Sequence, residues 1–190
     1  MKKNTLLICA VAVISFLSGC ATTGGLQGLD ADWGRENQGL QDKLGVKTYE
    51  NISKEKAMNA LMVAFQRLDL IVENSDFKTG FMMATANSPK PLTYDEYEIV
   101  KKAENDKAVG YEPRFSWDFF RDFKSQFNAV FLETGNGVQI SIRANLNFVG
   151  DRTSVIPITE FPSEGLKISL PKIWNEFEKV AFIQEKTLNK

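Results

Sequence analysis

One stretch alternates strictly between apolar and polar side chains, and it limits the possible folds more than any other part of the chain. From Val138 to Phe148 an apolar residue occupies every second position. Successive side chains of a β-strand point to opposite faces, so one face of this strand needs a core and the other faces water. A tight-turn signal, Gly135-Asn136-Gly137, precedes it, and an apolar segment precedes the turn. The sequence therefore predicts a long hairpin over residues 126–148.

The remaining elements follow from helical spacing, caps and turn residues. Ser53 is a helix N-cap candidate, and apolar residues at helical spacing follow it. Thr93 and Glu96 have the spacing of a capping box at the start of a polar helix. Pro171 suits the first turn of a last helix. The predicted elements are a helix over 54–68, strands over 69–74 and 81–86, the polar helix over 93–108, a long connection over 149–170 and a helix over 172–186.

These elements predict an α+β fold. Its simplest form is an antiparallel sheet of about four strands with two helices, the first and the last, packed on one face. The polar helix over 93–108 has few apolar positions, so we expect it to be an exposed insertion on the surface. An apolar content of 43 % is enough for one core, and we expect one globular domain over 48–190.

The amino terminus has the layout of an export signal. Lys2 and Lys3 precede an apolar run from Leu6 to Leu17. A helix needs about 20 apolar residues to cross a bilayer, so this run is too short to span it. It fits the apolar region of a secretory signal peptide, and the small residues Ser18 and Gly19 follow it. We therefore expect residues 1–19 to be a cleaved signal.

Leu17-Ser18-Gly19-Cys20 resembles the lipobox of bacterial lipoproteins. In that family a diacylglycerol is attached to the cysteine thiol, signal peptidase II cuts before the cysteine, and the new terminus is often acylated. The resemblance implies that Cys20 is the lipidation site and the first mature residue. Position 21 is Ala rather than Asp, which in this family implies sorting to the outer membrane with the domain facing the periplasm.

Residues 20–47 are predicted to form the lipidated cysteine and a flexible tether, because glycines and polar residues dominate the range. Within it, Arg35 to Leu44 has some helical character. Trp33 is the one large aromatic residue of the range. Two positions are open for its side chain: the membrane interface, or a docking site on the domain.

The segment from Ala60-Leu61 to Val72, the pair Thr79-Gly80, and Ile173-Trp174 with Phe177 to Ile183 resemble helix-grip-like domains of small envelope lipoproteins. The lipoprotein C subunit of the outer-membrane barrel assembly complex is one such protein. The resemblance implies a helix, a hairpin and a closing helix on a sheet, and an accessory role in the envelope. The inserted polar helix departs from the simple version of this fold.

Composition excludes several kinds of chemistry. The chain has no histidine, which removes Ser-His-Asp and Cys-His nucleophile systems and histidine metal sites. Its 23 basic residues face 24 acidic ones, so there is no basic excess for nucleic acid. Ser53-Lys54-Glu55-Lys56 and Lys78-Thr79-Gly80 match short strings of penicillin-binding proteins. A helix cap and a hairpin turn explain both matches, and we expect no catalytic residue, metal or cofactor.

An aromatic cluster lies at 115–127, and its fold is open between helix and strand. Core packing explains it most simply. The alternative is an exposed partner patch, since contiguous exposed aromatics mark interaction sites; its residues would be Phe115, Trp117, Phe119, Phe120 and Phe123. Asp118 and Asp122 lie beside these aromatics and are the one grouping that suggests a sugar-binding cleft.

Together these features predict a lipid-anchored cell-envelope lipoprotein that is not an enzyme. We expect a binding, structural or assembly-accessory role with a membrane contact through Cys20 and an envelope protein as partner. The alternative is a periplasmic lipoprotein that binds a lipid or glycan between the sheet and the long helix. An envelope hydrolase is the third class.

Overall fold

The computed structural model describes residues 27–107, 123–149 and 158–188. A helix over residues 27–44, here called the N-terminal helix, opens the described chain. The elements that follow it are β1 (Val46–Glu50), α2 (Lys54–Arg67), β2 (Ile71–Asp76), β3 (Phe81–Asn87), α3 (Tyr94–Lys107), β4 (Phe123–Glu133), β5 (Gly137–Phe148) and α4 (Ser163–Leu188). The α+β class predicted from the sequence is confirmed.

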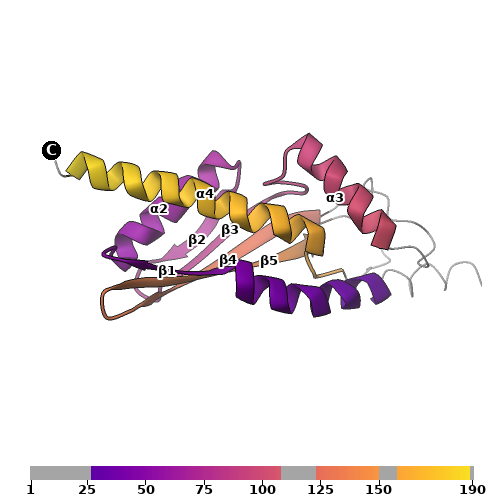
Figure 1. The fold of residues 1–190 in the computed structure, drawn as a ribbon, viewed down its shortest axis with the longest axis horizontal. Helices are drawn as coiled ribbons and strands as arrows, with labels where there is room; N and C mark the ends of the chain where they lie inside the picture. Colours follow the sequence, from indigo (N-terminus) through magenta and orange to yellow (C-terminus); the bar gives the residue numbers. More distant parts are fainter. Residues whose placement is uncertain (1–26, 108–122, 150–157, 189–190) are drawn as a thin grey trace, which may run out of the picture.

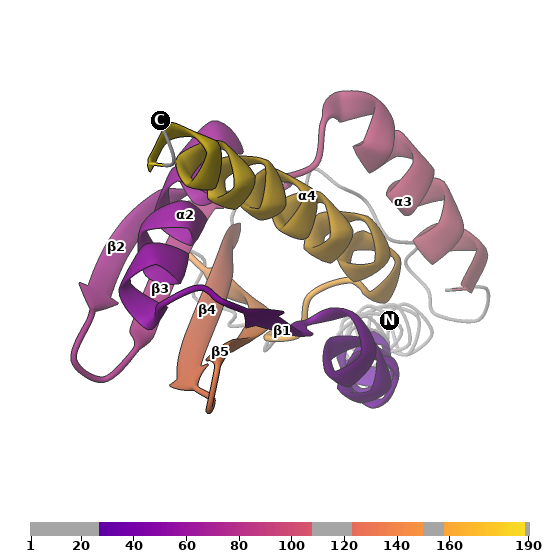
Figure 2. The ribbon, with the colours of Figure 1, turned by 60° about the vertical axis from the view of Figure 1, so that its left-hand side comes forward.

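The sheet has five antiparallel strands in the order β1-β5-β4-β3-β2. The long hairpin is present, and its strands pair from Phe123 with Phe148 to Glu133 with Val138. One strand more than expected is found, because β1 pairs with the first half of β5, from Val46 opposite Ser141 to Glu50 opposite Gly137. Figures 1 and 2 show α2 and α4 side by side across one face of the sheet, with α3 beyond the start of α4.

The core lies between that sheet face and the two helices. Phe127 of β4 lies with its ring 6.4 Å from Phe65 of α2 and 5.7 Å from Phe161 before α4. Phe177 and Trp174 of α4 meet edge to face at 6.0 Å. All five of these side chains are buried. The alternating half of β5 faces the same core, with Val138, Ile140, Ile142, Ala144 and Leu146 buried.

The expected helix starts are confirmed at α2 and α3. The Ser53 hydroxyl accepts the Lys56 amide at 3.3 Å and caps α2. The capping box of α3 is closed in both directions: the Thr93 amide donates to the Glu96 carboxylate at 2.7 Å, and the Glu96 amide donates to the Thr93 hydroxyl at 3.3 Å.

Two element starts were predicted wrongly. β2 begins at Ile71 rather than residue 69, because Asp69 has a positive φ of 59° and ends α2 in the left-handed conformation. α4 begins at Ser163, so the predicted connection over 149–170 is too long and Pro171 lies inside the helix. Pro171 is exposed and removes only one helical hydrogen bond, so water can satisfy the carbonyl that loses its donor.

The predicted flexible tether over 20–47 is replaced by ordered structure wherever it is described. Residues 27–44 form the N-terminal helix, and β1 starts at Val46. Gly45 joins them with no room for a side chain, since a Cβ there would lie 2.4 Å from the Ile142 carbonyl oxygen. Trp33 is 1 % exposed, so of the two positions that the sequence left open, its side chain takes the docking site on the domain.

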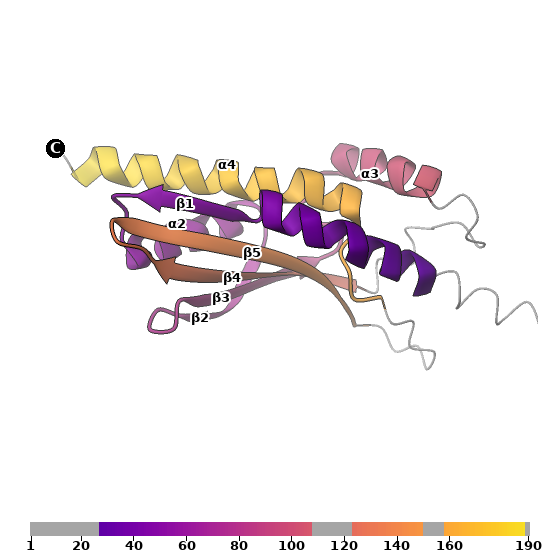
Figure 3. The same cartoon turned by 60° about the horizontal axis from the view of Figure 1, so that its bottom comes forward.

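The outer edge of β5 is covered along most of its length. Beyond β1, the Ile142 amide donates to the Gly45 carbonyl at 2.7 Å, and the Leu146 amide donates to the Thr159 carbonyl at 2.9 Å. Figure 3 shows the N-terminal helix running beside β5, past the end of β1. At the opposite edge of the sheet, β2 has an irregular register between Val72 and Asn74.

The sheet face opposite α2 and α4 carries amides and some apolar side chains. Val130 and Leu132 of β4 are 40 % and 55 % exposed, and they alternate with buried residues of the same strand. Ile71 at the sheet edge is 68 % exposed. Gln126 and Asn128 lie nearer the start of β4, where the Gln126 side-chain amide donates to the Asn128 side-chain oxygen at 3.0 Å. Among the described helices, none is long and apolar enough to cross a bilayer.

Candidate functional site

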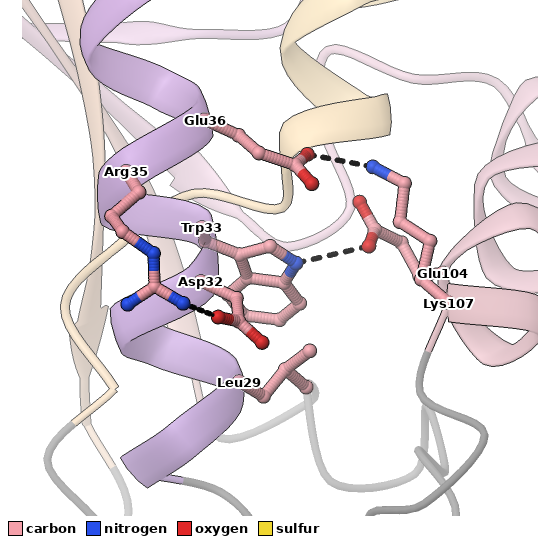
Figure 4. A pocket seen from close by; sticks show the side chains of 7 residues that line it. All are labelled: Leu29, Asp32, Trp33, Arg35, Glu36, Glu104 and Lys107. Atoms are coloured by element: carbon pink, nitrogen blue, oxygen red, sulfur yellow. Dashed lines mark hydrogen bonds and ion pairs between the residues drawn. The ribbon is translucent and has the colours of Figure 1, made fainter.

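Three helices meet at one end of the domain around a buried carboxylate, and we call this group of side chains the three-helix junction. It consists of Trp33 and Glu36 from the N-terminal helix, Glu104 and Lys107 from the last turn of α3, and Ser163 and Glu164 from the start of α4. Figure 4 shows Trp33 and Glu104 pointing toward one another across the gap between the N-terminal helix and α3. Glu104 is fully buried.

Three donors surround the Glu104 carboxylate. Its Oε2 accepts the Trp33 indole N–H at 2.9 Å. Its Oε1 accepts the Glu164 backbone N–H at 2.7 Å and the Ser163 hydroxyl at 3.4 Å. The first amides of a helix have no partner within the helix, and they carry the positive end of its dipole. Glu104 therefore caps α4 from a distant part of the chain and ties α4 to the N-terminal helix.

Burial raises the pKa of the Glu104 carboxyl group. The Glu164 amide, the Trp33 indole and the charge of Lys107 oppose this effect, and the Glu164 charge adds to it. Burial disfavours the charged form of a carboxyl group, whereas donors and cations favour it. Here burial prevails, so the junction holds a carboxylate that is protonated more readily than an exposed one.

Lys107 connects the outer part of the junction. Its Nζ lies 2.7 Å from Glu36, 2.6 Å from Glu164 and 2.9 Å from the Ser163 hydroxyl. Burial lowers the pKa of Lys107, but its hydrogen bonds to Glu164 and Glu36 outweigh burial and raise it. The same contacts hold the pKa values of Glu36 and Glu164 below their usual range against the effect of burial. Lys107 is thus a cation shared by two carboxylates.

A pocket of about 380 Å³ opens beside the junction. Its lining is mixed: Leu29, Asp32, Trp33, Arg35, Glu36, Glu104 and Lys107. Arg35 pairs with Asp32, and Lys107 pairs with Glu36 (Figure 4). Its charged groups are therefore bonded to one another, so the arrangement is suited to holding the three helices together. Within the ranges that the structure describes, no group of three His, Cys, Asp or Glu residues could hold a metal ion.

The residues singled out in the sequence have different outcomes. Cys20, Phe115, Trp117, Phe119 and Phe120 lie outside the described residues, as do Asp118 and Asp122. Phe123 is described, and it is fully buried in β4. For Phe123 the interpretation as core packing is therefore confirmed, and the alternative, that it belongs to an exposed partner patch, is wrong. The alternation of β4 turns its side chain toward the helices, with Phe127 and Phe131.

The two strings shared with penicillin-binding proteins have the structural roles expected of them. Ser53 is the cap of α2. Lys78 and Thr79 lie in the turn between β2 and β3, where the Asp76 carboxylate accepts their amides at 2.8 and 3.3 Å. The Lys54 ammonium donates to the Lys78 carbonyl at 3.3 Å, so the strings are close in space, but these contacts are those of a cap and a turn.

Sequence reasoning missed the junction. Glu104 was expected on a solvated helix face, since α3 has few apolar residues, yet Val100 one turn before it is also buried. These two positions are four residues apart and form the inner face of α3. In the N-terminal helix, Leu29 and Trp33 are also four residues apart, which is the spacing of one helix face. The next two positions of that face, Asn37 and Gln41, are polar, so the sequence showed no continuous apolar stripe.

Comparison with known protein families and with curated proteins found no match to this chain. Its function is therefore inferred from the residues and the geometry described above.

Proposed function

We propose that this chain is a lipid-anchored lipoprotein of the cell envelope, held in the outer membrane by acyl chains on Cys20 with its domain facing the periplasm. The observation that carries the proposal is the order of features at the amino terminus: two lysines, a short apolar run, and Leu17-Ser18-Gly19-Cys20. Each buried CH₂ contributes about 0.8 kcal/mol, so two or three acyl chains on one residue form a lasting anchor.

The start of the N-terminal helix adds a spatial consequence to this anchor. The helix is described from residue 27, and an extended chain spans at most about 3.6 Å per residue. The chain from Cys20 to the helix therefore reaches roughly 25 Å at most. The end of the domain where the helix begins would stay near the membrane. The tips of the two hairpins and the carboxyl end of α4 lie at the opposite end of the fold (Figure 1).

We propose a binding, structural or assembly-accessory role for the domain, with an envelope protein as partner. Exposed apolar side chains on the open sheet face support this role: Ile71, Val130 and Leu132. Exposed apolar side chains gathered on one face commonly mark an interaction site, and Val130 and Leu132 lie two positions apart on the same side of β4. The space between α4 and the sheet, where a bound lipid or glycan was the alternative, is filled by core side chains such as Phe65, Phe127 and Phe177.

The element order supports the resemblance to helix-grip-like envelope lipoproteins as part of this proposal. A strand, a helix, two strands, the hairpin of β4 and β5, and a long closing helix follow one another, and α2 and α4 lie on one sheet face. α3 is inserted between β3 and β4. The partner of any such relative is not carried over to this chain.

Lipidation is tested by expressing Cys20→Ala in the native host, with Cys9→Ala as the matched control. We expect Cys20→Ala to accumulate as a precursor without acyl chains, whereas Cys9→Ala is cleaved and acylated normally. Mass spectrometry of the amino-terminal peptide measures both. Normal cleavage of Cys20→Ala, or an unmodified Cys20 in the wild type, contradicts the anchor.

The partner is tested with a photo-crosslinking residue at Leu132, on the open face, and at Gln38, on the exposed side of the N-terminal helix. We expect one defined envelope protein to crosslink from Leu132 and not from Gln38, and Val130→Asp to abolish the product. A glycan or lipid product at Leu132 would support the alternative role. Identical products from both positions contradict a specific binding face.

A further inference from the structure

The contact between the N-terminal helix and the domain is unusual in composition. Four buried side chains spaced four residues apart form its stripe: Leu29, Trp33, Asn37 and Gln41. A helix that belongs permanently to a core normally presents a continuous apolar stripe. Here two positions of the four are amides, so hydrogen bonds as well as apolar packing hold the helix on the domain.

Those hydrogen bonds go to groups that water can also satisfy. The Asn37 amide donates to the Phe161 carbonyl at 2.7 Å, and the Gln41 amide donates to the Ala144 carbonyl at 3.4 Å. The Asp30 carboxylate accepts the Thr159 and Glu160 amides, each at 2.9 Å. The part of the domain beneath Asp30, Asn37 and Gln41 is therefore backbone and charge that water can solvate when the helix leaves, whereas Leu29 and Trp33 contribute the apolar part of the contact.

Two further features make a detached helix soluble and easily unwound. Its outer side is charged and polar, with Arg35, Gln38, Asp42 and Lys43 exposed. Gly28, Gly34 and Gly39 lie within it, and glycine is among the poorest helix formers. An isolated helix of this length is marginal in water even with better helix formers. The helix is thus folded mainly because it is docked.

We propose that the N-terminal helix is a releasable strap, fastened to the domain at the three-helix junction, whose release lengthens the link between the domain and its amino-terminal anchor. When the helix is docked, one end of the domain lies close to residue 27. When the helix is released, residues 27–44 become part of the link, and the folded domain begins at Gly45. The strap spans about 27 Å as a helix and about 60 Å when extended. The gain in reach rests on the proposed lipid anchor, whereas release itself does not.

Native-state hydrogen exchange on the full chain, purified from membranes in mild detergent, tests release. We expect amides of residues 31–44 to exchange together at least ~100-fold faster than amides of β4 and β5, through local opening. Equal rates in the helix and in β5 would overturn the proposal, because the helix would then leave only on global unfolding.

A disulfide separates release from simple fraying. A Cβ at Gly34 would lie 3.6 Å from the Glu160 Cγ, which places the two positions within range for a crosslink. In Gly34→Cys/Glu160→Cys, we expect oxidation to slow exchange of the helix to the rate of β5, and reduction to restore fast exchange. Fast exchange that the disulfide leaves unchanged would overturn the proposal.

Trp33→Phe provides a second variant that keeps the bulk of the side chain and removes the indole N–H. We expect the helix to exchange about tenfold faster again while β5 is unaffected. An equal acceleration in β5 would show that the helix belongs to the global folding unit and would overturn the strap. Hydrogen exchange tests release of the helix whether or not acyl chains are attached. A failure of lipidation at Cys20 would therefore contradict the proposed anchor without deciding the strap.

Discussion

Glu104→Gln is the most informative single change in the molecule. Three donors point at the two carboxylate oxygens. Glutamine keeps one oxygen for the Glu164 amide and the Ser163 hydroxyl, but it turns an NH₂ group toward the Trp33 indole N–H. A hydrogen bond to a charged group contributes about 1.5–3 kcal/mol, and removal of the buried charge offsets part of that loss. We expect the variant to be less stable by about 1–3 kcal/mol at pH 7.

The pH dependence of this difference tests the reasoning. Because burial raises the Glu104 pKa, the folded protein binds the proton more tightly than the unfolded chain does. The stability that Glu104 contributes is therefore fully present below the unfolded pKa, about 4.5, and is lost as the pH rises through the higher folded pKa. Glutamine does not titrate. The free energy of unfolding of the wild type should therefore exceed that of Glu104→Gln by a margin that grows as the pH falls from 8 to about 4.5. The total growth should be roughly 1.4 kcal/mol for each unit by which the folded pKa exceeds the unfolded pKa.

Urea unfolding followed by far-ultraviolet circular dichroism, at several pH values, measures this difference. Subtracting the variant curve from the wild-type curve removes the carboxyl groups common to both, including Glu36 and Glu164, whose lowered pKa values give the opposite trend. Glu98→Gln on the same helix is the matched control, since Glu98 is half-exposed and pairs with Lys101 on the helix surface; we expect a change within about 0.5 kcal/mol. A wild-type advantage that shrinks on acidification would refute this account, because it would mean that the donors outweigh burial.

Three other changes test the fold directly. Phe123→Ala should lower the free energy of unfolding by about 3–5 kcal/mol in thermal or chemical denaturation, because the Phe123 side chain is fully buried. Unchanged stability together with a loss of partner binding would instead support an exposed patch. Ser53→Ala should cost about 1 kcal/mol through loss of the α2 cap, whereas Ser53→Asp should keep stability near wild type, and equal losses in both would argue against capping. Gly45→Ala should lower the melting temperature and speed hydrogen exchange in residues 31–44, because the added Cβ would lie 2.4 Å from the Ile142 carbonyl oxygen and 2.6 Å from the Gln41 carbonyl oxygen. Wild-type values of both would show that the backbone moves aside at little cost.

The parts of the fold with a strong periodic signal were predictable from the sequence. The alternation in β5 predicts the hairpin and the buried face, and Ser53 and Thr93 predict two helix starts that the structure confirms. β1 was missed because a short edge strand has too few residues to show a period. Pro171 suggested a helix start, although an exposed proline also fits inside a long helix.

The three-helix junction could not be predicted because each member is ordinary in its own segment. Glu104 is one acidic residue in a polar helix, and Trp33 is one aromatic residue in a range rich in glycine. Their pairing joins positions 71 residues apart, and nothing local to either segment encodes it. The stripe of Leu29, Trp33, Asn37 and Gln41 escapes a search for apolar periodicity because two members are polar.

The two edges of the sheet determine how it could pair with a strand of another chain. Along β5 the backbone groups are already taken by β1, by Gly45 and by Thr159. Within the described ranges, β1 and β2 are the strands with an unpaired side, and both are short, with five and six residues. The ladder of β2 is also irregular between Val72 and Asn74. A strand from another copy would therefore find only a short ladder at either edge, which disfavours self-association by sheet extension.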